Sequence, residues 1–199
     1  VYHRLLLQNI RSAEIGNFYG YSSGLRNIET VNIYGRCLML DTEDISGNFI
    51  DVKSLRLESF KSNGSGKKVP LWLGNLKALE SLQIIRPDAN VFKVYGNIAD
   101  LPYSLKSLTL NSCDTSELVY STKPYTHYWN ESFTILSIDT ECPSMTSDMV
   151  DNILIDLAWC VNANEETRSV SLPKLKRTAS SDAAVEKLQE LGWKLNVPV

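Results

Sequence analysis

A short pattern of apolar residues recurs along the whole chain. Each copy is a pair of large apolar residues separated by one residue, usually with a third apolar residue three positions before the pair. The pairs are Leu5/Leu7, Val31/Ile33, Leu55/Leu57, Leu82/Ile84, Leu108/Leu110, Leu136/Ile138 and Val170/Leu172. Side chains alternate across a strand, so both members of a pair face the same way. The pattern therefore predicts seven short strands, each with an apolar inner face and a more polar outer face.

The spacing of these pairs indicates how the strands are arranged. Their first members stand 24 to 34 residues apart, and an L-x-x-L-x-L core at this period is typical of leucine-rich repeats. One repeat cannot cover its own apolar face, so such repeats stack on one another. The connecting segments, such as 44–48 and 96–102, are rich in turn residues and too short for long helices. We predict an α/β leucine-rich repeat solenoid with a parallel sheet on its concave face and a mostly irregular convex side.

The pattern changes near the C-terminal end of the chain. Apolar residues follow helical spacing from Met149 to Leu157, behind a plausible N-cap region at 146–148. A second helix is predicted over 180–192, which ends in a glycine, and a short strand over 193–197. Because a solenoid end needs a cover for its last apolar layer, these elements are predicted to form a helical C-terminal cap.

Composition narrows the class of protein without identifying a ligand. Hydrophobic residues make up 43% of the 199 residues, which is enough for the core of one domain. We expect one continuous domain, with repeats over 1–145 and a last repeat and cap over 146–199. The net charge of −3 does not suggest a nucleic-acid binder. No apolar run approaches the roughly 20 residues that a membrane span needs.

Three of the four cysteines follow the apolar pair of their repeat by three or four residues, where side chains turn inward. They are Cys37, Cys113 and Cys142. Buried free thiols are the prediction at these positions, with a Cys113–Cys142 disulfide between adjacent repeats as the alternative. The chain has two histidines and no C-x-x-C or nucleotide-binding motif, so no metal site and no cofactor is predicted.

Two longer stretches carry a family resemblance. Residues 96–110 match a G-x-I-x-x-L-P-x-S-L-x-x-L-x-L unit, and residues 177–193 read R-T-x-x-S-D-x-A-V, followed by Leu188 and a final Gly-Trp. Both stretches resemble the secreted and surface leucine-rich repeat proteins that are common in gut Bacteroidetes. The resemblance implies an exported or cell-surface protein that acts as a binding module.

The residues between and beside each apolar pair are expected to form the concave face of the sheet. Most of them are small, neutral and polar. The candidate ligand-binding residues on this face are Tyr34, Arg56, Glu58, Gln83, Ile85, Thr109, Asn111 and Asp139. A solvated surface with Ser and Thr ladders is one interpretation, and a recognition surface is the other. Arg56 and Glu58 alternate on one strand and are expected to pair with each other.

The connection between the fifth and sixth apolar pairs is a second candidate site. Three of its clustered aromatic residues are candidate ligand contacts, Tyr125, Tyr128 and Trp129. Clustered Tyr and Trp can stack on sugars or anchor a protein interface. In the alternative interpretation, which the burial habits of aromatic residues favour, they pack on the convex side of the solenoid.

No catalytic motif is recognisable in the sequence. Neither His3 nor His127 lies in a nucleophile–base motif. Asp114, Asp139 and Glu141 lie near strand ends and are the carboxylates that a hydrolase would use. We therefore predict a non-enzymatic module, secreted or on the cell surface, that binds a protein or a glycan. A structural segment of a larger surface protein is the alternative, and a carboxylate-dependent hydrolase is a distant one.

Overall fold

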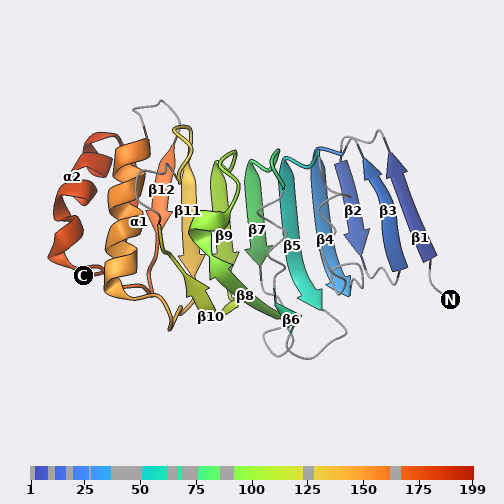
Figure 1. The fold of residues 1–199 in the computed structure, drawn as a ribbon, viewed down its shortest axis with the longest axis horizontal. Coiled ribbons are helices and arrows are strands. Elements are labelled where there is room, and N and C mark those ends of the chain that lie inside the picture. The colour runs from blue at the N-terminus through green and yellow to red at the C-terminus, as the bar shows by residue number, and fades with distance from the viewer. Residues whose placement is uncertain are drawn as a thin grey trace.

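The fold is mixed α/β and is built mainly from parallel strands, as the computed structural model shows (Figure 1). The structure describes residues 3–8, 12–16, 20–26, 28–36, 51–61, 67–68, 76–85, 92–122, 128–161 and 167–199. Every strand pairing within these residues is parallel. No helix in this part of the chain is long and apolar enough to cross a membrane.

One eight-stranded sheet runs along the molecule, and we call it the front sheet. Its strands lie in the order β13-β12-β11-β9-β7-β5-β4-β2. Their bounds are β2 Ser12–Gly16, β4 Thr30–Arg36, β5 Ser54–Lys61, β7 Ser81–Ile85, β9 Ser107–Asn111, β11 Ile135–Asp139, β12 Arg168–Ser171 and β13 Trp193–Asn196. The parallel sheet predicted from the apolar pairs is confirmed.

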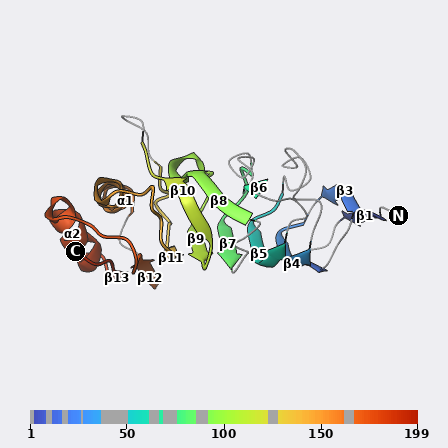
Figure 2. The same ribbon diagram turned by 90° about the horizontal axis from the view of Figure 1, so that it is seen from below.

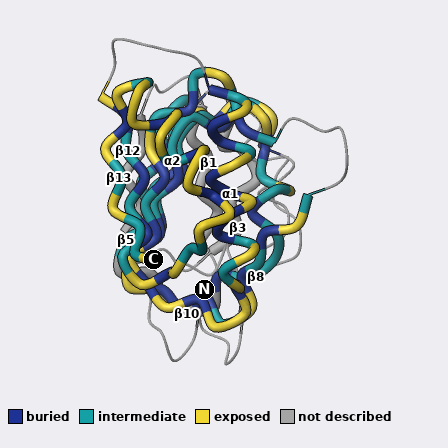
Figure 3. Tube along the Cα trace, turned by 90° about the vertical axis from the view of Figure 1, so that its left-hand side faces the viewer, coloured by how far each residue is buried: buried dark blue, intermediate teal, exposed yellow. Residues whose placement is uncertain are grey.

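The back of the molecule, which is opposite the front sheet and nearer the viewer in Figure 1, carries five further strands in two small sheets. Their bounds are β1 His3–Gln8, β3 Gly20–Arg26, β6 Lys67–Lys68, β8 Phe92–Asn97 and β10 Asp114–Val119. In the end-on view, β1, β3 and β8 lie across the molecule from β5, β12 and β13 (Figure 3). The expectation of a mostly irregular convex side was therefore wrong where β8 and β10 lie. Val94 of β8 and Leu118 of β10 are 5% and 4% exposed, so these strands also face the core.

The apolar pairs of the front sheet lie in register and fill its inner face. The register aligns Val31 with Leu55, Leu55 with Leu82, and the same positions onward to β12. From Val31/Ile33 to Val170/Leu172, no member of a pair is more than 2% exposed. The third apolar residue is buried too, at Ile28, Val52, Leu79, Leu105 and Phe133. Burying a large aliphatic side chain contributes about 1.5–3 kcal/mol, so this ladder is the main source of the fold's stability.

The first predicted pair lies in a different sheet from the other six. Leu5 and Leu7 belong to β1, which pairs with β3 behind the front sheet. The strand beside β4 is β2, whose Ala13 and Ile15 lie opposite the Val31/Ile33 pair. The prediction was wrong here because an Ala-x-Ile pair is a weaker apolar signal than Leu-x-Leu.

Two helices cover the C-terminal end of the front sheet (Figures 1 and 2). Helix α1, Ser147–Cys160, follows an N-cap at Thr146, whose side chain accepts a hydrogen bond from the Met149 amide. A 3₁₀ turn, η5 at Ala179–Ser181, leads into α2, Asp182–Glu190. Another 3₁₀ turn, η4, spans Ile98–Asp100. Gly192 has a φ of 84°, which favours glycine after a helix and confirms its predicted role.

Two of the cysteines predicted to be buried are buried free thiols, Cys113 and Cys142. Cys113 Sγ donates to the carbonyls of Ile84 and Asn111 at 3.4 Å, and Cys142 Sγ donates to Thr115 Oγ1 at 3.0 Å. Burial raises the pKa of Cys113 to about 12. The alternative disulfide is not formed, and Cys37 lies outside the described residues.

Candidate functional site

From β4 to β13, the outer face of the front sheet presents three columns of residues, with at most one residue per strand in each column. The middle column is Asn32, Arg56, Gln83, Thr109, Ser137, Ser171 and Asn196. The preceding column is Thr30, Ser54, Ser81, Ser107, Ile135, Ser169 and Lys194. The following column is Tyr34, Glu58, Ile85, Asn111 and Asp139. All eight residues predicted for this face therefore lie in two adjacent columns, although the side chain of Tyr34 is outside the described part.

Arg56 links two strands at the middle of this face. Its Nε and Nη2 donate to Glu58 Oε2 at 3.0 and 2.8 Å, and its Nη1 donates to Gln83 Oε1 of β7 at 3.1 Å. The Arg56 side chain is 38% exposed and that of Glu58 is 45% exposed. The predicted pairing is confirmed. A pair this exposed contributes only about 0–1 kcal/mol of stability, so its main effect is to orient the guanidinium.

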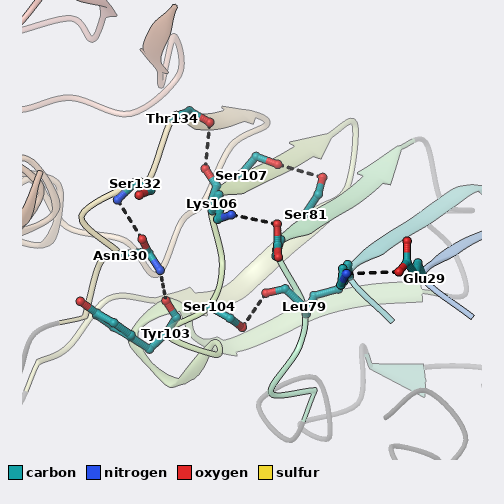
Figure 4. Close-up of polar contacts among 12 residues, drawn as sticks. Glu29, Leu79, Ser81, Tyr103, Ser104, Lys106, Ser107, Asn130, Ser132 and Thr134 are labelled. Carbon is teal, nitrogen blue, oxygen red and sulfur yellow. Dashed lines mark hydrogen bonds and ion pairs between the residues drawn. The ribbon is translucent and has the colours of Figure 1, made fainter. Parts of the chain in front are cut away.

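Small hydroxyl groups bond to one another across the same face. Ser107 Oγ donates to Ser81 Oγ at 2.8 Å, between β9 and β7 (Figure 4). Asn196 Nδ2 donates to Ser171 Oγ at 3.4 Å, between β13 and β12. The Ser and Thr ladder that the sequence suggested is therefore present in part. These bonds fix side chains on the outer face without burying them.

A row of alternating charges follows the edge where the front strands begin, and we call it the charge ladder. It consists of Glu29, Lys53, Glu80 and Lys106, each one residue before the preceding column. Lys53 Nζ lies 3.2 Å from Glu29 Oε1, and Lys106 Nζ lies 3.0 Å from Glu80 Oε2 (Figure 4). Sequence reasoning missed this row. The same alignment that found the apolar pairs would have shown an acid and a base alternating at one repeat position.

The turns beside the charge ladder are closed by side chains that bond to backbone groups. Asn130 Nδ2 donates to the Tyr103 carbonyl at 3.0 Å, and Ser104 Oγ donates to the Leu79 carbonyl at 2.7 Å (Figure 4). Thr134 Oγ1 donates to the Lys106 carbonyl at 3.1 Å. These groups stabilise the connections between strands. Because they already form hydrogen bonds within the protein, they have little hydrogen-bonding capacity left for a ligand.

The aromatic connection packs against the core. Trp129 is 4% exposed, stacks on Tyr120 with centroids 6.0 Å apart, and meets Phe133 edge-on at 4.6 Å. Its Nε1 donates to Tyr120 Oη at 3.1 Å, and Tyr120 Oη donates to Asp156 Oδ2 of α1 at 2.9 Å. Burial raises the pKa of Tyr120, and the nearby Asp156 carboxylate raises it further. The packing interpretation therefore holds for Trp129, which has too little exposed surface to contact a ligand.

Of the other two aromatic candidates, Tyr128 is the one that lies within the described residues. Tyr128 is half-buried and meets Tyr120 edge-on at 6.5 Å, while Tyr125 lies outside the described residues. A small hollow is lined by Ile98, Ala99, Leu101, Pro102, Leu105, Tyr120, Tyr128 and Trp129. It has room for about one water molecule, which is too little for an organic ligand.

Of the carboxylates considered for a hydrolase, Asp139 and Glu141 do not line this hollow. Asp139 is exposed, with Lys174 Nζ 4.0 Å from its Oδ1, and Glu141 is also exposed. The side chain of Asp114 lies outside the described part of the chain. Among the residues that the structure describes, no group of three or more His, Cys, Asp or Glu side chains could hold a metal ion.

Comparison of the chain with protein-family models, with curated proteins and with solved structures finds no match. The function of the front sheet must therefore be inferred from its own residues and geometry. Of the two candidate sites, the outer face of the front sheet keeps its side chains accessible, whereas the aromatic connection buries Trp129.

Proposed function

We propose that this chain is a leucine-rich repeat solenoid that acts as a non-enzymatic binding module, secreted or displayed at the cell surface. The outer face of its front sheet binds a protein. One observation carries the proposal, the bridge from Arg56 to Gln83 at the centre of a face whose polar side chains are held in register. The solenoid assignment is supported by the L-x-L pairs, which repeat in register on buried inner positions.

The geometry of this face suits recognition of another macromolecule. A sheet whose strands are hydrogen-bonded on both sides is rigid, so binding costs little conformational entropy. Arg56 is oriented before any ligand arrives, and arginine is enriched among the residues that dominate binding energy. Ile85 and Ile135 add aliphatic surface, and Ile135 is 39% exposed. Seven strands at about 4.8 Å per strand give a surface roughly 30 Å long.

A protein fits this face better than a glycan does. Sugar recognition uses exposed aromatic rings as stacking platforms. The aromatic residue of the connection that would serve best, Trp129, is buried. The outer face instead combines a charge pair, amides and aliphatic surface, as protein interfaces do.

A structural segment without a ligand of its own is the second candidate function. The observation in its favour is that several polar groups on the outer face satisfy one another, as in Ser81–Ser107 and Arg56–Glu58. Such a face would be a solvated surface that keeps the domain soluble.

The test is a pair of screens, one against a protein array and one against a glycan array, followed by affinity measurements with four variants. Arg56→Glu and Gln83→Ala change the face, while Lys187→Glu and Gln189→Ala make matched changes at exposed positions of α2. We expect a protein ligand whose affinity falls at least about tenfold for the face variants only.

Three results would contradict the proposal in different ways. Equal affinities for all four variants would place the binding site elsewhere on the chain. A ligand found only on the glycan array would change its chemical class. Absence of any ligand on both arrays would favour the structural segment.

A further inference from the structure

The outer side of α1 carries a stripe of four exposed residues, which we call the α1 stripe. It consists of Asp148, Asn152, Ile155 and Trp159. At 100° per residue, these positions lie opposite the helix's buried face, which includes Val150, Ile153, Leu154 and Leu157. In Figures 1 and 2, no other described element covers this side of the helix. The stripe is therefore open to a partner.

The apolar half of the α1 stripe is unusual for a solvated helix face. Trp159 is 75% exposed and Ile155 is 41% exposed, and they stand one helical turn apart. Single exposed apolar residues are ordinary, but two at i and i+4 are neighbours on the helix surface and form one patch. Tryptophan is also enriched among the residues that dominate binding energy at protein interfaces. The patch therefore suits a partner helix.

The spacing of the α1 stripe allows a second copy of the same helix to be that partner. Its steps of four, three and four residues are those of a coiled-coil seam. The steps read the same in both directions, with a midpoint between residues 153 and 154. In an antiparallel pair of α1 helices, residue 148 of one copy therefore lies opposite residue 159 of the other, and 152 lies opposite 155.

Charge and hydrogen bonding favour this antiparallel arrangement. It places the Asp148 carboxylate of one copy beside the Trp159 indole N–H of the second copy, which can donate to it. It also brings the two Ile155 side chains together near the two-fold axis. A parallel pair would instead set the two Asp148 carboxylates against each other, and like charges at an interface oppose binding.

We infer that the α1 stripe is a self-association surface whose partner is the α1 helix of a second copy, packed antiparallel about a two-fold axis. The same patch then serves both subunits, as in an isologous dimer. The twelve residues from Asp148 to Trp159 span roughly 16 Å along the helix axis, which is shorter than a standard-size interface requires. The dimer is therefore weak and depends on concentration. This surface is separate from the front sheet and does not depend on its proposed function.

Sedimentation velocity over a concentration series from about 10 μM to about 1 mM tests the inference. We expect the mean mass of the wild-type chain to rise toward that of a dimer. The Ile155→Lys/Trp159→Lys double variant is expected to weaken dimerisation at least about tenfold. Tyr103→Lys is the matched control, because Tyr103 is 53% exposed but lies in a turn far along the chain from α1. Circular dichroism establishes that each variant is folded.

Asp148→Ala tests the direction of the pairing. The antiparallel arrangement predicts a weaker dimer, because the acceptor for Trp159 is lost. The parallel arrangement predicts a stronger one, because two like charges are removed, and that result would overturn the proposal. A dimer that persists in the double variant would also overturn it. A chain that stays monomeric at about 1 mM would overturn the proposal as well. That result would indicate that the partner of the α1 stripe is a protein of different sequence.

Discussion

Thr178 Oγ1 donates a 2.6 Å hydrogen bond to Asp151 Oδ2, which ties the segment before α2 to the buried side of α1. Asp151 is 3% exposed and also accepts from the Thr178 amide at 3.0 Å and from Ser181 Oγ at 2.5 Å. Arg177 bonds to Asp182 beside it. The R-T-x-x-S-D stretch is therefore a structural clamp that fastens α1 and α2 together.

Replacing the carboxylate of the clamp should destabilise the whole domain. Asp151→Ala leaves the Thr178 amide and two hydroxyl groups without their acceptor in a buried site. We expect the free energy of unfolding to fall by about 2–4 kcal/mol, measured by urea denaturation. Glu186→Ala, at an exposed position of α2, is the control and should change it by less than about 0.5 kcal/mol. Equal effects for the two variants would contradict the clamp.

The contribution of Asp151 to stability should depend on pH. Burial opposes its charge, but hydrogen bonds from Ser181 and Thr178 and the charge of Arg177 outweigh burial and hold its pKa below 3.8. A carboxylate with a lowered folded-state pKa stabilises the protein above its unfolded-state pKa and loses that effect as pH falls through the folded value.

The difference in unfolding free energy between wild type and Asp151→Asn should therefore be constant near neutral pH and shrink as pH falls below 3.8. Denaturation curves at several pH values measure it. A difference that is the same at pH 7 and at acid pH would show that the carboxylate's charge plays no part.

Truncating a side chain on the inner face of a strand should lower the free energy of unfolding more than truncating its neighbour on the outer face. Leu82 is 2% exposed, whereas the adjacent Gln83 points to the outer face of the front sheet. Leu82→Ala should cost about 2–5 kcal/mol of unfolding free energy because it leaves a cavity. Gln83→Ala should cost less than about 0.5 kcal/mol. Similar losses of unfolding free energy for both variants would mean that the side chains of this strand do not alternate between the two faces of the sheet.

The Tyr120 hydroxyl should contribute to the stability of the protein through two hydrogen bonds. It accepts from Trp129 Nε1 and donates to Asp156, so Tyr120→Phe leaves two buried or half-buried polar groups unpaired. We expect a loss of about 1–3 kcal/mol in a thermal or urea melt. Tyr103→Phe removes a hydroxyl from an exposed ring and should be neutral. An unchanged melt for Tyr120→Phe would show that water replaces both bonds.

The front sheet could be predicted because its evidence is local and periodic. Leu55 and Leu57 must face the same way, and the same pair recurs at each strand, so register follows from repetition. The two C-terminal helices could be predicted for a similar reason, from a cap residue such as Thr146 and a helical spacing of apolar residues.

What the sequence could not reveal depends on contacts between distant residues. Asp151 is a charged residue on an otherwise apolar helix face, and its partners lie 27 and 30 residues away. Nothing near Trp129 in the chain shows whether its ring packs inward or projects into solvent. The strands behind the front sheet, β8 and β10, were missed because their apolar residues do not follow the repeating pair.

The charge ladder constrains how a chain of this kind can change its length. Glu29 and Lys53 pair between neighbouring strands, as do Glu80 and Lys106. Here a unit is one strand of the front sheet with its connecting segment. Deleting the one unit that contains Lys53 would set Glu29 beside Glu80. Deleting two units would instead set Glu29 beside Lys106 and keep the alternation. Gain or loss of units in even numbers therefore preserves the ladder, and duplication of a single unit interrupts it.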